Sequence, residues 1–116
     1  MGSLRKKETE ERYKEVRASG GLDGPCVLCN KPALKTFTAW KIIKNEYPYD
    51  KIALVHDMLV PIRHVTQDQL TQEEIDELNE IKETYIHSTY EWILEATTKM
   101  KSIPDHFHIH MITAQD

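Results

Sequence analysis

The sequence predicts an α+β domain: a small antiparallel β-sheet with one long helix packed on one face, and a further helix at the N-terminus. Three observations support this fold class. Residues 71–100 combine a helix-start signal with recurring apolar positions. Residues 36–43 and 51–61 are rich in β-branched and other apolar side chains, as strands are. Residues 106–112 alternate histidine with apolar residues, which is the period of a strand.

The chain of 116 residues has the length of a single domain, and its 40% hydrophobic and 29% charged residues are ordinary for a globular protein. We expect residues 1–24 to form a charged helix or arm and residues 25–116 to form the main domain. A net charge of −4 gives no reason to expect nucleic acid or an anionic membrane as partner. Two cysteines are too few for a disulfide framework, and no apolar run could span a bilayer, so we expect a cytoplasmic protein.

The charged segment "LRKKETEERYKEVR" (4–17) predicts a solvated helix that ends at the glycine pair 20–21. Leu4, Tyr13 and Val16 form a thin apolar stripe that could dock this helix on the domain. The mixed charges favour a surface helix over a binding tail.

The middle of the chain predicts two strands followed by a helix. We expect a strand around residues 36–43, a turn at "NEYPYD", and a second strand in "KIALVHDMLVP" that Pro61 ends or confines to an edge. Thr71 and Glu74 have the spacing of a capping box, so the long helix begins there. Its expected apolar face, up to about residue 100, consists of Ile75, Leu78, Ile81, Tyr85, Trp92, Leu94 and Ala96.

The stretch "HFHIHMI" (106–112) places His106, His108 and His110 on one face of the predicted strand, with apolar residues on the other. Neighbouring histidines on that face are roughly 6.6 Å apart and the outer two roughly 13 Å. Two adjacent rings could therefore share a metal ion, but all three could not. We expect a division of labour between a ligand at one end and reactive imidazoles beyond it. The alternative is a half-exposed strand whose polar face happens to be histidine.

Cys26 and Cys29 have the Cys-x-x-Cys spacing of a zinc knuckle, which needs two further ligands from His, Asp or Glu. His64 is a candidate third ligand, whereas His56 on its own could be an ordinary core residue and His87 falls on the helix surface. A thiol redox pair is a second interpretation, although the proline three residues after the second cysteine does not suit the helix start that such a pair needs. Two inert, reduced cysteines are the third.

Together these motifs resemble the histidine triad (HIT) superfamily of nucleotide hydrolases and transferases. "HFHIHMI" fits the pattern His-φ-His-φ-His-φ-φ, where φ is an apolar residue. The Cys-x-x-Cys pair, a strand, "HDMLVPIRHV" (56–65) and a long helix precede it in the same order. The resemblance covers residues 26–112.

The resemblance implies a role for five residues. His108 would be the nucleophile that attacks the α-phosphate of a nucleoside phosphate and forms a nucleotidyl-histidine intermediate. His110 would contact phosphate oxygens or relay a proton, and His56 would lie near the reacting centre. Asn45 would lie near the ribose, and Ser102 would stand close to the serine or threonine that many members carry before the triad.

The resemblance also implies a structural zinc ion held by Cys26, Cys29, His64 and His106, and a possible homodimer. Many members have a glycine-rich loop and another strand between the long helix and the triad. Here "ATTKMKSIPDHFHIH" (96–110) is expected to run almost straight from helix to triad without that strand. The alternative function is therefore a zinc-stabilised domain that binds a nucleotide or a protein without catalysis.

Overall fold

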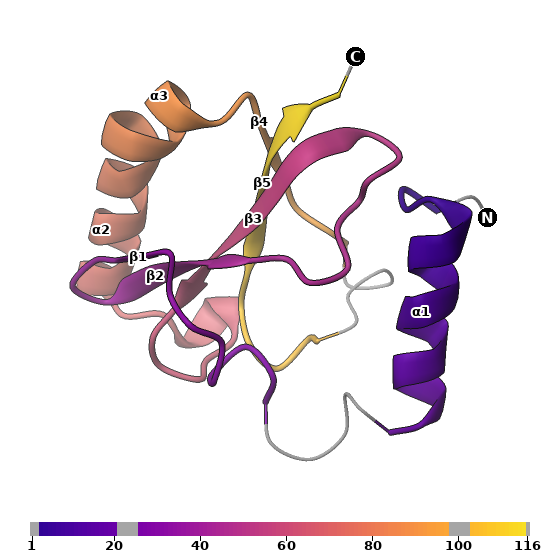
Figure 1. Ribbon diagram of the computed structural model, residues 1–116. Coiled ribbons are helices and arrows are strands. Elements are labelled where there is room, and N and C mark those ends of the chain that lie inside the picture. Colours follow the sequence, from indigo (N-terminus) through magenta and orange to yellow (C-terminus); the bar gives the residue numbers. More distant parts are fainter. Residues whose placement is uncertain (1–2, 21–25, 98–102, 116) are drawn as a thin grey trace.

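The computed structural model describes residues 3–20, 26–97 and 103–115, and it has the predicted α+β architecture (Figure 1). Five antiparallel strands form one sheet in the order β1-β2-β3-β5-β4. The elements are α1 (Lys7–Ala18), β1 (Lys35–Thr36), β2 (Trp40–Lys44), β3 (Ala53–Pro61), α2 (Gln72–Ile81), α3 (His87–Thr89), β4 (Trp92–Leu94) and β5 (Ile109–Ala114). A 3-10 turn (Gln67–Gln69) precedes α2, and a π-helical turn (Lys82–Ile86) joins α2 to α3.

The main core lies between the sheet and α2, which therefore covers one face as the sequence predicted. In Figure 1 the strands lie between α2 on one side and α1 on the other. The buried residues of this core come from β2, β3, the helical segment and the triad segment: Trp40, Ile42, Leu59, Leu78, Ile81, Ile86, Phe107, Ile109 and Met111. A smaller cluster of Leu28, Ile43, Met58 and Val60 lies apart from it.

The predicted capping box at the start of α2 is confirmed. The Thr71 hydroxyl accepts the Glu74 N–H at 3.2 Å, and the Glu74 carboxylate accepts the Thr71 N–H at 2.8 Å. The helical run, however, ends at Thr89 and not near residue 100. Tyr90 has an extended backbone, and its hydroxyl donates to the buried Asp57 carboxylate at 2.6 Å, which anchors the chain at the sheet.

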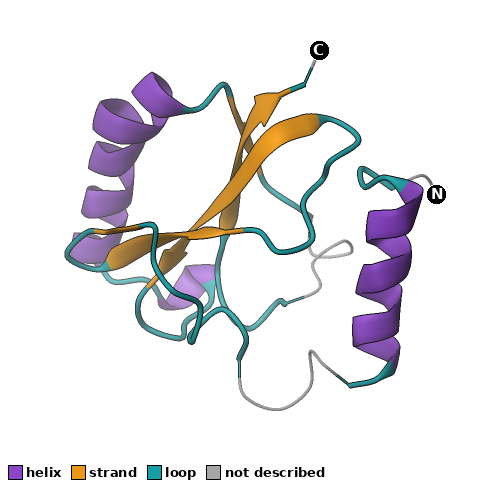
Figure 2. Cartoon of the chain, viewed as in Figure 1, coloured by secondary structure: helices purple, strands orange, loops and turns teal. Residues whose placement is uncertain are grey.

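Beyond Tyr90 the chain forms β4, which pairs with β5 and adds an edge strand (Figure 2). The expectation that this protein lacks a strand between helix and triad is therefore wrong. The apolar residues Trp92 and Leu94 suit either helix or strand, and pairing with β5 decides the outcome. Trp92 lies 62% exposed on this edge.

The single strand predicted around residues 36–43 is also corrected, because β1 and β2 form a hairpin there. The Phe37 N–H donates to the Trp40 carbonyl at 2.7 Å and closes the turn. The Glu77 carboxylate of α2 accepts the N–H groups of Thr38 and Ala39 at 3.1 and 2.7 Å. Tertiary contacts thus hold a turn that no glycine or proline marks.

Strand β3 ends at Pro61, as predicted, but β5 begins at Ile109 and not at the first histidine. The last pair between the two strands is Leu59 with Ile109, and the Phe107 N–H donates instead to the Val65 carbonyl at 2.7 Å. The apolar residues at 107, 109 and 111 still enter the core on the α2 side. The predicted alternation therefore extends beyond the strand.

Helix α1 ends where Gly20 adopts a φ of 81°, in line with the predicted glycine stop. Tyr13 is buried against the domain, whereas Leu4 is 45% exposed, so the predicted docking stripe is narrower than expected. Within the described ranges, no helix combines the length and apolar character needed to cross a membrane.

Candidate metal centre and histidine site

The structure brings the four predicted metal ligands together. The ligand atoms of Cys26, Cys29, His64 and His106 all lie within 4.8 Å of one another. The Nδ1 atom of His106 is 3.4 Å from both sulfur atoms, and Nδ1 of His64 is 3.4 Å from the Cys29 sulfur. The cysteines come from a turn, His64 from the segment after β3, and His106 from the approach to β5.

These distances fit a tetrahedral metal ion. With metal–sulfur bonds of about 2.3 Å and metal–nitrogen bonds of about 2.0–2.1 Å, a sulfur–nitrogen edge of the tetrahedron is about 3.6 Å. The fully buried His106 also has a carbonyl partner, because its Nε2 lies 2.8 Å from the Pro61 oxygen. That carbonyl accepts the Nε2 proton and leaves the Nδ1 lone pair directed at the sulfur atoms, as a metal ligand requires.

The chemistry of this cluster also favours a cation. Burial lowers the pKa of His106, which keeps its ring neutral. Burial also raises the pKa of the Cys29 thiol, and a bound metal ion would offset that by stabilising the thiolate. Both cysteines are free thiols. The cluster can therefore bind a metal ion.

The remaining histidines of the predicted site form a second group. His108 is 7% exposed, and its Nδ1 lies 2.9 Å from the backbone carbonyl of His106. Because a carbonyl only accepts, the neutral ring carries its proton on Nδ1 and donates it there. The lone pair of that ring is then on Nε2. Its ring centroid is 5.2 Å from that of His110.

His56 and His110 contact each other directly, with His56 Nε2 2.7 Å from His110 Nδ1. The Tyr49 backbone N–H donates to His56 Nδ1 at 2.9 Å, so neutral His56 holds its proton on Nε2. That proton is donated to His110 Nδ1, which leaves the His110 proton on Nε2. These two contacts therefore orient a short relay from the loop backbone to the triad.

Asn45, which was expected near a ribose, lies beside this relay and is 7% exposed. Its side-chain oxygen accepts the Tyr47 N–H at 2.8 Å, and its amide nitrogen lies 3.2 Å from His56 Nε2. The Asn45 amide nitrogen and His56 Nε2 both carry protons, so Asn45 packs against the relay and does not accept the His56 proton. Ser102, the other residue expected near nucleotide, lies outside the described residues.

Burial and charge keep both relay histidines neutral. Burial, followed by the charge of Arg5, lowers the pKa of His56 to about 4. Burial and the charges of His56, His108 and Arg5 lower the pKa of His110 to about 3. Near pH 7 the pair can donate and accept hydrogen bonds without carrying charge.

Two residues next to this site were not anticipated from the sequence. The Tyr49 ring packs 4.6 Å from the His56 ring and 5.0 Å from the His110 ring, measured between centroids. The sequence contains little sign of this role for Tyr49. It lies four residues after Asn45, in a segment that predicted only a turn. Arg5 had no such sign, because it reaches the site from the segment before α1, 44 residues away from Tyr49 in the sequence. His87, by contrast, is exposed on α3 as predicted.

No protein-family model and no curated protein matches the chain, so any assignment depends on its own residues and geometry.

Proposed function

We propose that this protein is a nucleotide hydrolase or nucleotidyltransferase of the histidine triad type, which uses His108 to attack the α-phosphate of a nucleoside phosphate. The observation that carries the proposal is the contact between His108 Nδ1 and the His106 carbonyl. It assigns the lone pair of the neutral ring to Nε2, which is the atom that could attack phosphorus.

The proposed reaction has two steps. In the first, the Nε2 lone pair of His108 forms a bond to the α-phosphorus, and the bond from phosphorus to the leaving group breaks with its electron pair going to that group. In the second, water attacks the same phosphorus, loses a proton to solvent, and the nitrogen–phosphorus bond returns its pair to His108. An alcohol or phosphate in place of water would make the reaction a transfer.

His110 would stabilise charge on the phosphate in both steps. Its Nε2 proton is directed away from His56 and is available to a phosphate oxygen. Because burial lowers its pKa to about 3, we expect it to donate a hydrogen bond from the neutral ring and not to act as an imidazolium acid. Leaving groups that are stable as anions, such as phosphates, suit this arrangement best.

We further propose that the cluster of Cys26, Cys29, His64 and His106 holds zinc, since two thiolates and two imidazoles form one of its usual tetrahedral sets. Bound there, zinc would supply a cross-link between the cysteine turn and the start of the triad. The cross-link would fix the His106 backbone, and with it the carbonyl that orients His108.

Replacement of His108 tests the proposal. His108→Asn removes the nucleophile but keeps a polar side chain, so turnover should fall by more than 1,000-fold while the metal content stays unchanged. The assay would follow AMP release from AMP esters, phosphoramidates and dinucleoside polyphosphates. His87→Asn, at an exposed histidine on α3, is the matched control and should retain full activity.

The alternative is a zinc-stabilised domain that binds a nucleotide or a protein without catalysis, and the low exposure of His108 (7%) favours it. Nucleotide binding by wild-type protein with no AMP released from any of the three substrate classes would select this alternative over the enzyme.

A further inference from the structure

Arg5 lies just before α1, and its guanidinium group packs against two tyrosine rings. Its guanidinium carbon lies 4.1 Å from the centroid of the Tyr13 ring and 5.0 Å from that of Tyr49. Its Nε donates to the Tyr47 carbonyl at 2.7 Å, and its Nη1 donates to the Glu10 carboxylate at 3.3 Å. The side chain is 14% exposed. A largely buried cation therefore joins α1 to the loop that precedes β3.

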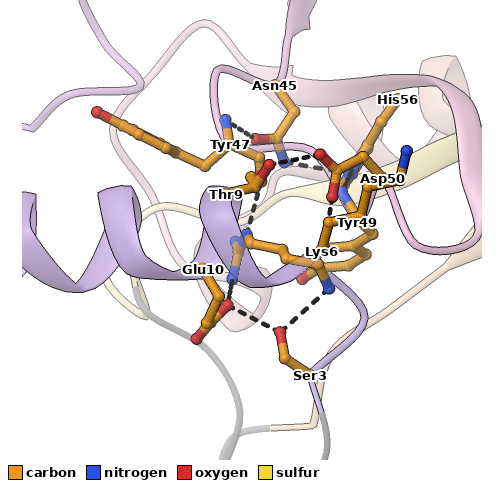
Figure 3. Close-up of polar contacts among 10 residues, drawn as sticks. Ser3, Lys6, Thr9, Glu10, Asn45, Tyr47, Tyr49, Asp50 and His56 are labelled. Atoms are coloured by element: carbon orange, nitrogen blue, oxygen red, sulfur yellow. Dashed lines mark hydrogen bonds and ion pairs between the residues drawn. The ribbon is translucent and has the colours of Figure 1, made fainter.

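Asp50 of the same loop makes a second attachment (Figure 3). Its carboxylate accepts the Lys6 backbone N–H at 2.7 Å and the Thr9 hydroxyl at 2.5 Å. Those groups lie at the start of α1, where unpaired N–H groups and the helix dipole favour a negative charge. The start of α1 is thus fixed to both ends of the segment from Tyr47 to Asp50.

Tyr49 lies in the middle of that segment and contacts the histidine relay in two ways. Its backbone N–H selects the His56 tautomer, and its ring covers His56 and His110. Arg5 packs against the same ring. A continuous stack of side chains thus connects the N-terminal helix to the relay.

We propose that residues 3–18 are a functional part of the histidine site, in which Arg5 is a positioning residue that holds Tyr49 against His56 and His110. The role of Arg5 in the reaction rests on the proposed function. The coupling between Arg5 and the two rings is a property of the free protein and needs no substrate.

The coupling has a measurable electrostatic consequence. The charged or titratable groups facing the pair are Arg5 from the N-terminal segment, Tyr49 from the loop and His108 from the triad. Burial raises the pKa of Tyr49, so that ring stays neutral. Arg5 disfavours a positive charge on either relay histidine, and its removal should make both easier to protonate.

The test is a pH titration of the ring nitrogen signals of His56 and His110 by NMR in the full-length chain. Arg5→Met removes the charge and keeps an apolar stem, and it should raise both midpoints by about one pH unit. Arg5→Lys restores the charge and should return the midpoints close to wild type. The matched control is Arg12→Met, because Arg12 is an exposed arginine of the adjoining helix α1 whose guanidinium carbon lies 5.7 Å from the centroid of the Tyr47 ring.

A rise in Arg5→Met that is absent from Arg12→Met supports the inference, and midpoints equal to wild type in Arg5→Met overturn it. If Arg5→Met does not fold, Asp50→Ala, which detaches the start of α1, is judged in the same way. Failure of the proposed chemistry would appear separately, as a lack of AMP release in wild-type protein.

Discussion

His106 and His108 are two residues apart, and backbone carbonyls give their rings opposite tautomers. The Pro61 carbonyl takes the Nε2 proton of His106, which directs Nδ1 at the cysteines. The His106 carbonyl takes the Nδ1 proton of His108, which leaves the lone pair on Nε2. His106 can therefore bind a metal ion while the lone pair of His108 stays available for the proposed reaction, and the His106 peptide unit links the two groups.

These contacts predict the tautomer of each ring. When the rings are neutral, we expect His108 to carry its proton on Nδ1, and His56 and His110 to carry theirs on Nε2. Two-bond nitrogen–proton NMR spectra of the imidazoles distinguish the two forms directly. An Nε2-protonated His108 would remove the physical basis for its proposed role as nucleophile.

At the scale of elements, Glu74 joins three parts of the fold. It completes the capping box of α2 and makes a bidentate ion pair with Arg63, with distances of 2.7 and 3.1 Å. Its backbone carbonyl also accepts the Trp40 indole N–H at 2.9 Å. The helix, the segment after β3 and strand β2 are thus fixed to one another close to His64.

Glu74→Gln keeps the cap but removes the charge, and we expect it to lower the free energy of unfolding at pH 7 by about 1–2 kcal/mol. The bond from Arg63 is the main reason that the pKa of Glu74 falls to about 2. The stabilisation is therefore complete above the unfolded-state pKa of about 4.3 and declines as the pH falls toward about 2.

Urea unfolding of wild type and Glu74→Gln between pH 7 and pH 3 measures this effect. The free energies of unfolding of wild type and Glu74→Gln should become more similar as the pH falls. Glu73→Gln, at the exposed neighbouring position, is the control and should change stability far less. A constant difference between wild type and Glu74→Gln across this range would contradict the account.

Local sequence signals predicted the start of α2 and the end of β3, but they missed the end of the helix at Thr89, the start of β5 at Ile109 and the strand pairings. The capping box at Thr71 and the stop at Pro61 depend on neighbouring residues, so the sequence contains them. Strand β4 depends on pairing with β5 across about 20 residues of chain, and its apolar residues fit a helix equally well. The β1–β2 turn depends on Glu77, which lies 38 residues from Ala39. Such distant contacts leave no local pattern.

At the scale of the whole molecule, the metal cluster joins segments that are far apart in the chain. Cys26 and His106 are separated by 80 residues, and their ligand atoms are 3.4 Å apart. The Cys-x-x-Cys spacing predicted the two cysteines and left His64 as a candidate, whereas His106 was expected as the fourth ligand from the resemblance to the histidine triad superfamily. The contact of Arg5 with Tyr49, the ring that packs on the relay, could not be predicted, because an arginine in a charged segment and a tyrosine in a turn are common without such a contact.

We expect about one zinc ion per chain in protein purified under reducing conditions, measured by elemental analysis. Cys26→Ser and His64→Ala should each lose most of the metal and several kcal/mol of stability, because metal binding is coupled to folding. Strong chelators should lower the melting temperature of wild type toward that of these variants. Metal-free protein with unchanged stability would contradict the assignment of zinc.

The central claim is that the His108 ring forms a covalent bond to the α-phosphorus of a nucleotide. It is tested most directly by mixing the protein with a diadenosine polyphosphate, whose leaving group is a phosphate, quenching within milliseconds to seconds, and mapping the modified peptide by mass spectrometry. The account predicts an adenylyl group on His108 that is absent from His108→Asn and disappears as AMP is released. Turnover of the substrate with no adenylated protein, or an adenylyl group on another residue, would contradict it.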